Sequence, residues 1–224
     1  MYLYETHLHT APVSRCARST VREMLTMYRD LGYRGVFVTN HFIDGNINVD
    51  KTLPYEDKIR FYFSDYEEAK AISAEIGIDV FLGVELSFGG TDFLIYGLTP
   101  DWFLSHPEIE DMKKSEELAL MAEEGALIIQ AHPFREANYI DHIRLFPRRI
   151  HGVEIINAAR SEFENSMAKL YADAYGLLYF AGSDKHSVKP GKLAGVSFEE
   201  PIKSEQDFIE KVQKGKATVF ERTF

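Results

Sequence analysis

The sequence predicts an α/β protein in which strands and helices alternate and the strands close into a barrel. Short apolar runs alternate with amphipathic segments of helical period, a pattern typical of a parallel sheet with helices outside it. The chain has 224 residues and shows no break in composition, no internal repeat and no linker, so we expect one domain over residues 1–224. With about seven strand–helix units in one domain, closure into a barrel is more economical than two open sheets.

The predicted strands are short runs rich in apolar, β-branched and aromatic residues. They cover residues 2–10, 35–39, 79–84, 91–96, 126–130, 152–156, 177–181, 194–198 and 217–220. The strand over residues 91–96 either runs antiparallel to its neighbour or follows it through the tight turn at Gly89 and Gly90.

The predicted helices begin at capping residues and end at glycines. They cover residues 21–31, 64–76, 108–124, 162–175 and 204–214, with a short helical piece from residue 100. Ser19 or Thr20 caps the first helix, and a capping box of Ser64 and Glu67 opens the second. Residues 42–59 are expected to form a long loop, and loops of this length are usually functional or mobile.

The composition limits the function classes. The net charge is −10, which disfavours general binding to nucleic acids or to anionic membranes. A small phosphorylated substrate remains compatible, because a metal cluster and a few arginines reverse the sign of the charge locally. The single cysteine, Cys16, excludes an intrachain disulfide, and nothing resembles a secretory signal or a membrane span. We therefore expect a cytoplasmic protein, and its oligomeric state stays open.

The opening strand carries two histidines separated by one apolar residue. Because successive side chains of a strand alternate between its faces, His7 and His9 point the same way and Leu8 points the opposite way. Two imidazoles delivered to one small volume are able to grip a divalent metal ion.

Further residues of metal-ligand type follow the later apolar runs. In an α/β barrel such residues meet at the carboxyl ends of the strands, where the active site lies. The whole set is His7, His9, His41, Glu85, Asp92, His132, Asp184 and His186. Mixed imidazole and carboxylate ligands suit Zn²⁺, Mn²⁺ or Fe²⁺. Eight candidates exceed the coordination of one ion, so two or three divalent ions are expected, with Glu85 as the natural bridge between them.

Each of these residues also has a structural interpretation. Asp92 suits a turn, His132 precedes a proline in a loop, and His41 suits a buried hydrogen-bonding position. The agreement of the whole set, at the same end of successive strands, favours the metal site.

The motifs that carry these residues resemble those of a known family. They are His7-Leu8-His9-Thr10, Thr39-Asn40-His41, Gly83-Val84-Glu85, Ala131-His132-Pro133 and Gly182-Ser183-Asp184-Lys185-His186. Together they resemble the PHP (polymerase and histidinol phosphatase) family of metal-dependent phosphoesterases over most of the chain. The resemblance implies a distorted (βα)₇ TIM-like barrel with three metal ions. It implies one ion at His7, His9, Glu85 and Asp184, a second at Glu85 and His132, and a third at His41 and His186.

The sequence departs from the family pattern at three positions. Asn40 replaces the usual aspartate of the second motif, so a carboxylate behind the ligands is missing there. Asp92 stands where a histidine is common, which keeps a ligand and adds negative charge. The loop after the first strand often supplies a further ligand, and here Arg15 stands at about that spacing. Cys16 is the nearest candidate, either as a metal ligand that favours Zn²⁺ or Fe²⁺ or as a small buried residue.

A phosphate group requires cationic side chains in addition to the metal ions. Arg135 and Arg160 follow strand ends by a few residues, and either is able to donate two parallel hydrogen bonds to phosphate oxygens. Arg18 is a further candidate on the loop after the first strand, and each of the three also suits an exposed surface position.

The favoured function is hydrolysis of a small phosphate ester by a metal-bound hydroxide. The substrate classes are a phosphomonoester such as histidinol phosphate or a nucleotide, a phosphodiester, and a phosphotyrosine. Among the catalytic residues, Glu85 bridges the ions, Asp184 orients the hydroxide, and His186 or His41 serves the ion at the leaving oxygen. Two alternatives stay open, an amidohydrolase-like hydrolase of C–N or C–O bonds and a non-catalytic module stabilised by metal.

Overall fold

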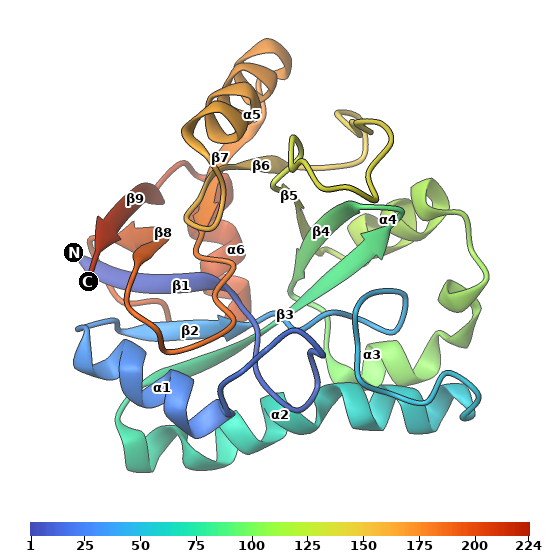
Figure 1. Cartoon of the computed structure of the whole chain (residues 1–224), viewed down its shortest axis with the longest axis horizontal. Coiled ribbons are helices and arrows are strands. Elements are labelled where there is room, and N and C mark those ends of the chain that lie inside the picture. Colours follow the sequence, from blue (N-terminus) through green and yellow to red (C-terminus); the bar gives the residue numbers. More distant parts are fainter.

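The computed structural model describes residues 1–224 and contains one mixed sheet of nine strands (Figure 1). The strands are β1 (Tyr2–Leu8), β2 (Gly35–Val38), β3 (Asp79–Phe88), β4 (Thr91–Tyr96), β5 (Leu127–Ala131), β6 (Gly152–Asn157), β7 (Leu178–Gly182), β8 (Lys192–Phe198) and β9 (Thr218–Thr223). Their order in the sheet is β7-β6-β5-β4-β3-β2-β1-β8-β9. Every strand overlaps a run that the sequence predicts.

The sheet combines parallel and antiparallel pairs. Strands β1, β2 and β3 are parallel to one another, and so are β5, β6 and β7. Strand β4 is antiparallel to β3, because Gly89 and Gly90 adopt left-handed conformations and reverse the chain in a tight turn. It is antiparallel to β5 as well. Strands β8 and β9 form an antiparallel pair beside β1.

The barrel closes between β1 and the residues that follow β7, a boundary that we call the β1–β7 seam. Leu8 and Lys185 form a parallel bridge there, and the His9 N–H donates to the Lys185 carbonyl at 2.9 Å. The Thr6 hydroxyl donates to the Ala181 carbonyl across the same seam. The barrel class predicted from the sequence is confirmed, although the sheet has nine strands where the resemblance implies seven. The assignment of residues 1–224 to one domain stays a prediction.

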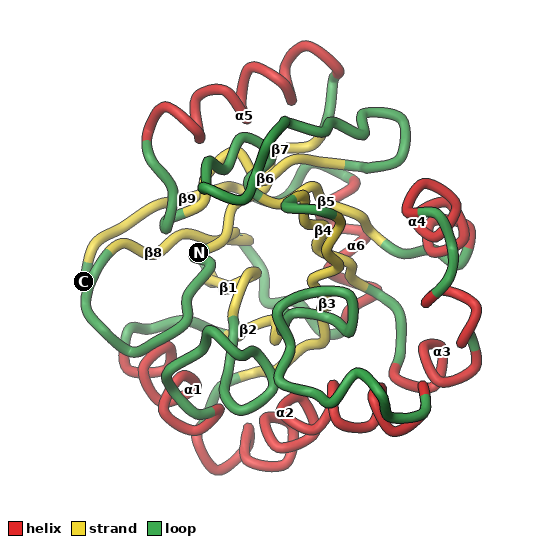
Figure 2. The backbone as a smooth tube through the Cα atoms, turned by 45° about the vertical axis from the view of Figure 1, so that its right-hand side comes forward, coloured by secondary structure: helices red, strands yellow, loops and turns green.

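The helices lie around the outside of the strands (Figure 2). They are α1 (Val21–Asp30), α2 (Tyr55–Ile76), α3 (Pro100–Ser105), the 3₁₀-helix η1 (Pro107–Glu110), α4 (Lys114–Glu123), α5 (Glu162–Tyr175) and α6 (Glu205–Gln213). Thr20 caps α1 and forms a capping box with Glu23, while Ser161 does the same for α5 with Glu164. No helix of the structure is long and apolar enough to span a membrane.

Two helix boundaries differ from the prediction. Helix α2 begins at Tyr55, so Ser64 lies inside it and its hydroxyl donates to the Phe61 carbonyl instead of capping the helix. Ile59 and the aromatic side chains Tyr62 and Phe63 lie at helical spacing and are buried, which explains why the helix starts earlier. The preceding loop is correspondingly shorter.

The helix predicted over residues 108–124 is divided into η1 and α4. Lys113 has an extended backbone conformation, with ψ at 138°, and breaks the helical path between them. In η1 the bonds are those of a 3₁₀ turn, with Asp111 N–H donating to the Glu108 carbonyl at 3.1 Å. Residues 108–124 are rich in charged residues that favour helices, so nothing in the sequence signals this break.

The interior of the barrel is apolar and is closed at one end by α6. The interior cluster contains residues of seven strands together with Phe208, Ile209 and Val212 of α6. Phe208 stacks among aromatic rings from the strands, with its ring centroid 4.4 Å from that of Phe37. The apolar fill leaves the carboxyl ends of the parallel strands as the polar end of the barrel.

A bulge in β1 determines which of its side chains face the barrel interior. Tyr4 belongs to the interior cluster, whereas Leu8 packs outside against α1 and α2. Strict alternation would place both on the same face, but the register shifts between Glu5 and Leu8. The shift turns His7 and His9 toward the interior, the face opposite to Leu8 that the sequence predicts for them.

Candidate metal centre

Glu85 of β3 lies at the centre of a buried cluster of histidines. Its Oε1 is 3.0 Å from His7 Nε2 and 3.5 Å from His132 Nε2. Its Oε2 is 2.5 Å from His41 Nδ1 and 3.5 Å from His9 Nε2. The two oxygens therefore face different pairs of imidazoles. This is the arrangement of a carboxylate that bridges two cations.

Asp184 is the second carboxylate of the cluster. Its Oδ1 lies 3.4 Å from His9 Nε2 and 3.6 Å from His186 Nδ1, and its Oδ2 lies 3.9 Å from His132 Nε2. Asp184 and His132 are the two non-glycine residues with positive φ, at 51° and 26°. Residues other than glycine rarely adopt such backbone conformations. Their energetic cost is tolerated where function requires the side chain to point in a particular direction.

Two candidate ligands, Glu85 and Asp92, do not follow the carboxyl end of a strand as the sequence predicts. Glu85 lies within β3, which continues to Phe88, and not directly after the strand. Asp92 lies near the amino end of β4. Because β4 is antiparallel, Asp92 pairs with Ala131 at the end of β5, so its side chain still reaches the same end of the barrel.

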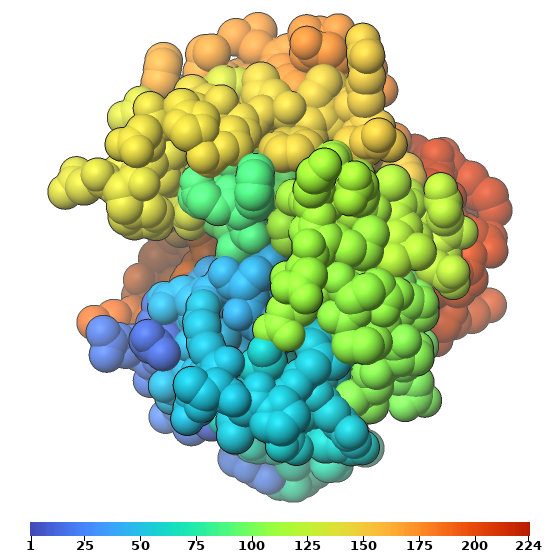
Figure 3. Space-filling model, turned by 90° about the vertical axis from the view of Figure 1, so that its right-hand side faces the viewer, coloured from blue at the N-terminus to red at the C-terminus, as the bar shows by residue number.

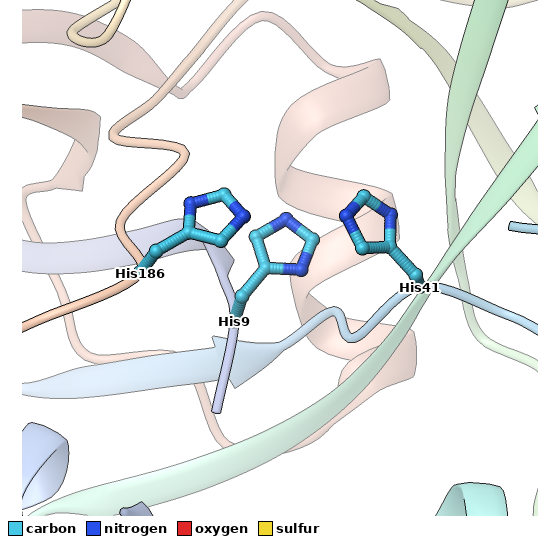
Figure 4. A group of neighbouring side chains, drawn as sticks. All are labelled: His9, His41 and His186. Atoms are coloured by element: carbon cyan, nitrogen blue, oxygen red, sulfur yellow. The ribbon is translucent and has the colours of Figure 1, made fainter. Parts of the chain in front are cut away.

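The side chains form three groups whose nitrogen and oxygen atoms lie within 4.8 Å of one another. The groups are His7, His9 and Asp184; His7, Glu85 and His132; and His9, His41 and His186. The last group is shown in Figure 4, where the His9 ring lies between the other two rings. The centroid of the His9 ring is 4.3 Å from that of His41 and 4.2 Å from that of His186. These groups overlap with the three ligand sets that the family resemblance implies.

Several polar atoms of the cluster are buried without a hydrogen-bond partner. They are His9 Nε2 and both ring nitrogens of His132. Buried polar atoms without partners are costly, and several at one place call for an ion or another ligand. The residues present therefore fit divalent cations bound by imidazole and carboxylate.

The electrostatics of the cluster combine burial with close charges. Burial opposes ionisation of Glu85, but His41 and the other adjacent imidazoles outweigh it and hold the Glu85 pKa well below its usual value. Burial and the neighbouring His186 and His41 hold the pKa of His9 well below its usual value, which keeps its imidazole neutral. Burial lowers the pKa of His41, but the Glu85 charge outweighs it and holds that pKa well above its usual value. Because metal ions bind the neutral imidazole, a cation at His41 would have to displace its proton.

Cys16 lies beside the group of His9, His41 and His186 and is half-buried. Burial raises the pKa of the Cys16 thiol, but hydrogen bonds with His186 and His41 outweigh this effect and lower the pKa to about 6. The structure thus brings Cys16 to the position where the sequence predicts a further ligand, and its role as a ligand stays a prediction.

Glu154 of β6 is a functional residue that the sequence analysis missed. Its side chain is fully buried, and its Oε1 lies 2.9 Å from His7 Nδ1. Its Oε2 accepts from the His132 N–H at 3.0 Å and from Asn157 Nδ2 at 2.8 Å. A carboxylate at Nδ1 fixes the ring and leaves His7 Nε2 for a cation. A charged residue inside an apolar strand was the available signal.

Glu5 of β1 was missed as well, and it connects the two sides of the β1–β7 seam. Its Oε1 accepts from the N–H groups of His7 at 2.8 Å and of Ser183 at 2.9 Å. Burial raises the pKa of Glu5, while hydrogen bonds from Ser183 and Tyr28 act in the opposite direction. Glu5 therefore holds the backbone on which His7 and Asp184 are placed.

Asp65 of α2 is a third buried carboxylate that the sequence did not single out, after Glu154 and Glu5. It lies behind the end of β2. Asn40 Nδ2 donates to its Oδ2 at 3.1 Å. The expectation that Asn40 leaves this region without a carboxylate is therefore wrong, because α2 supplies one. Ser14 was missed too, and it lies between Asn40 and His9.

A cavity of about 500 Å³ opens beside the cluster. In Figure 3 the segment after β5 (yellow) projects above the segment after β2 (blue), with the β3–β4 turn (green) between them. The cavity is lined by Cys16, His41, Asp44, Asp92, Arg135, Tyr139, Arg160, Asp184 and His186, among others. Its polar walls and two arginines suit a small anionic ligand.

The three predicted phosphate-binding arginines differ in their positions. Arg135 lines the cavity and its guanidinium lies 2.9 Å from the Asp92 carboxylate, so this pair competes with metal binding by Asp92. Arg160 lines the cavity and its Nε is buried without a partner. Arg18 is exposed and does not line the cavity, although its backbone N–H donates to the His186 carbonyl at 2.7 Å. The structure brings two of the three together.

Comparison with known proteins agrees with this architecture. Residues 162–217 match the model of the PHP-associated family. None of the curated proteins matches the chain. A two-domain protein of Bacteroides vulgatus that contains a predicted PHP-like metal-dependent phosphoesterase is similar in structure, with a TM-score of 0.69 at 14% identity. The match covers 98% of this chain and 64% of that protein, so the chain spans less than two thirds of its length.

Two further solved structures are similar over most of their length. A candidate metal-dependent phosphoesterase of Bifidobacterium adolescentis has a TM-score of 0.58 at 15% identity, with coverage of 92% of this chain and 94% of that chain. An amidohydrolase of Chromobacterium violaceum with bound sulfate and no metal has a TM-score of 0.52 at 15% identity, with coverage of 82% and 87%. At these identities the likeness concerns the fold.

The chain is thus an α/β barrel whose buried imidazole–carboxylate cluster has the residue types and spacing of a divalent-metal site. The PHP-associated segment and the shared fold confirm the resemblance to the PHP family that the sequence predicts.

Proposed function

We propose that this chain hydrolyses a small phosphate ester with the help of two or three divalent ions, Zn²⁺, Mn²⁺ or Fe²⁺. The substrate classes are a phosphomonoester such as histidinol phosphate or a nucleotide, and a phosphotyrosine. The observation that carries the proposal is Glu85, whose two oxygens face different imidazole pairs. Its neighbours His41 and Asp184 line a cavity together with two arginines.

The proposed ligands are the residues that the sequence singles out. They are His7, His9, Cys16, His41, Glu85, Asp92, His132, Asp184 and His186. When bound, the ions supply a water of lowered pKa and neutralise negative charge on the phosphoryl oxygens. Glu85 lies between the histidine pairs and would be a ligand shared between the ions.

Asp184 and His186 are proposed to act on the reacting water and the leaving group. Asp184 lies at the cavity wall and is 8% exposed, so one oxygen is able to orient the water and take its proton. His186 also lines the cavity, and its side chain is 27% exposed, so it would be accessible to the leaving group of a bound substrate.

Arg135 and Arg160 are proposed to hold the phosphate group. Both line the cavity, and the Nε atom of each is buried without a hydrogen-bond partner. Donors that lack partners in the free protein are available to a phosphate oxygen. Arg18 does not line the cavity and has a weaker case for contact with a small substrate.

A second candidate function is hydrolysis of a C–N or C–O bond. The likeness to the Chromobacterium violaceum amidohydrolase favours it only through the fold. The two arginines on the cavity wall favour a phosphate ester over an uncharged amide. We also propose a cytoplasmic location and a small phosphorylated molecule as the partner.

Metal analysis combined with a substrate screen tests the proposal. Purified protein is expected to hold two or three ions per chain and to hydrolyse compounds within a panel of nucleotides, histidinol phosphate and phosphotyrosine, with amides as the contrasting panel. His132→Ala is expected to abolish turnover, whereas His142→Ala, a change at an exposed histidine of the same loop, is expected to leave it unchanged. A folded chain that binds no metal and turns over neither panel would instead be a non-catalytic module.

A further inference from the structure

A chain of buried hydrogen bonds runs from Asp65 of α2 to the ring of His9. Its members are Asp65, Thr10, Asn40, Ser14 and His9, and each of them is at most 2% exposed. They come from three separate parts of the chain, namely the end of β1, the end of β2 and the middle of α2. Because these side chains are buried from water, each of their hydrogen-bond donors must find an acceptor within the protein.

The orientation of the Asn40 amide is fixed from two sides. Asn40 Oδ1 accepts from the Thr10 backbone N–H at 2.7 Å, and a backbone N–H is only a donor. Asn40 Nδ2 donates to Asp65 Oδ2 at 3.1 Å and to Thr10 Oγ1 at 2.8 Å, and the Thr10 hydroxyl itself donates to Asp65 at 2.7 Å. A flipped amide would place a donor against the Thr10 N–H.

The amide orientation fixes the direction of the Ser14 hydroxyl. Ser14 Oγ lies 2.8 Å from Asn40 Oδ1, which is only an acceptor, so the single hydroxyl proton of Ser14 points to Asn40. The two lone pairs of the Ser14 oxygen then face the His41 backbone N–H at 3.1 Å and His9 Nδ1 at 3.1 Å. Both of these groups must donate to Ser14.

We infer that Ser14 and Asn40 are positioning residues that hold His9 in the Nδ1–H tautomer and leave its Nε2 free for a cation. The opposite tautomer would have Ser14 donate to His9 and would lose the bond from Ser14 to Asn40. His9 Nε2 is fully buried, has no hydrogen-bond partner and faces Asp184 Oδ1 at 3.4 Å. Asp65 anchors the amide from behind and supplies negative charge without being a ligand. The inference rests on the proposed metal site and not on the proposed reaction.

Nitrogen NMR of the imidazoles in the metal-free protein tests the inference directly. In the wild type, His9, identified by the signal that disappears in His9→Asn, is expected to carry its proton on Nδ1. Asn40→Leu removes the acceptor of the Ser14 proton, so Ser14 turns to His9 and the proton of His9 moves to Nε2. Asn40→Asp keeps the acceptor and keeps Nδ1–H, and Ser14→Ala gives a mixture of tautomers.

The control is Glu154→Gln, which alters a buried carboxylate behind His7 and is expected to leave the His9 tautomer unchanged. Zn²⁺ affinity, measured by chelator competition, is expected to fall about 10- to 100-fold in Asn40→Leu and to stay near the wild-type value in Asn40→Asp/Asp65→Asn.

A wild-type protein with the His9 proton on Nε2, or an Asn40→Leu protein that keeps this proton on Nδ1, would overturn the inference. If the tautomers behave as expected but no metal binds, the positioning of the His9 ring stands, whereas its role toward a cation and the proposed function both fail. If metal binds and the tautomers behave as expected but no phosphate ester is hydrolysed, the proposed function fails and the inference stands. If Asn40→Leu does not fold, the wild type and Ser14→Ala decide it.

Discussion

Gly182, at the end of β7, allows the two sides of the β1–β7 seam to approach closely. A Cβ atom at this position would lie 2.4 Å from His7 Cβ and 2.6 Å from Glu154 Oε1. Carbon atoms in contact are normally separated by about 3.5–4.0 Å, so β1 and β7 would have to separate by roughly 1 Å. Gly182→Ala is therefore expected to cost about 3 kcal/mol, the upper part of the range for overpacked positions. Because His7 moves with β1, metal affinity is expected to fall as well.

Urea denaturation of the metal-free protein and equilibrium dialysis with Zn²⁺ measure the two effects of Gly182→Ala. The matched control is Gly176→Ala, at the end of α5, where φ is 65° and no atom lies within 4 Å of an added Cβ. It is expected to cost about 1 kcal/mol for the left-handed backbone and to leave metal binding unchanged. An unfolding midpoint and a metal content equal to the wild type in Gly182→Ala would refute the steric argument.

Three further predictions concern the metal site and its surroundings. Chelation is expected to lower the thermal midpoint, since each ion present at 100 times its Kd adds about 2.7 kcal/mol; an unchanged midpoint would contradict the buried metal site. Co²⁺-loaded protein is expected to show a thiolate-to-cobalt charge-transfer band that disappears in Cys16→Ser, and the chain has no other cysteine that could produce it. Burial raises the pKa of Glu117 to about 7 despite its ion pair with Lys114, so its stabilising contribution is complete below about pH 4.5 and is lost as pH rises through 7. Glu117→Gln is expected to flatten the pH profile of urea unfolding over that interval, with an upper limit of about 3 kcal/mol, and a parallel profile would contradict it.

Much of the metal site was predictable because its residues follow apolar runs. His41, His132 and Asp184 come directly after such runs, and parallel strands bring their carboxyl ends to one edge. The pattern placed Asp92 correctly at this edge even though β4 runs in the opposite direction. The ligand roles themselves stay predictions, since geometry brings the atoms together without an ion.

The supporting residues were not predictable in the same way. Glu5, Asp65 and Glu154 form hydrogen bonds with residues that are distant in the sequence, and no local spacing encodes such partners. Nothing in the sequence distinguishes Ser14 from other loop serines, because its role depends on its contacts with Asn40 and His9 in the folded structure. The helix boundaries failed for a related reason, because burial against the sheet decided where α2 begins.

The seam has a consequence for how the protein is made. Its hydrogen bonds join Glu5 to Ser183, which are 178 residues apart in the chain. A ribosome must therefore release the chain as far as Asp184 before His7 meets it, so no shorter N-terminal fragment brings these two side chains together. Pairings this distant form slowly, so acquisition of metal should report the final stage of maturation.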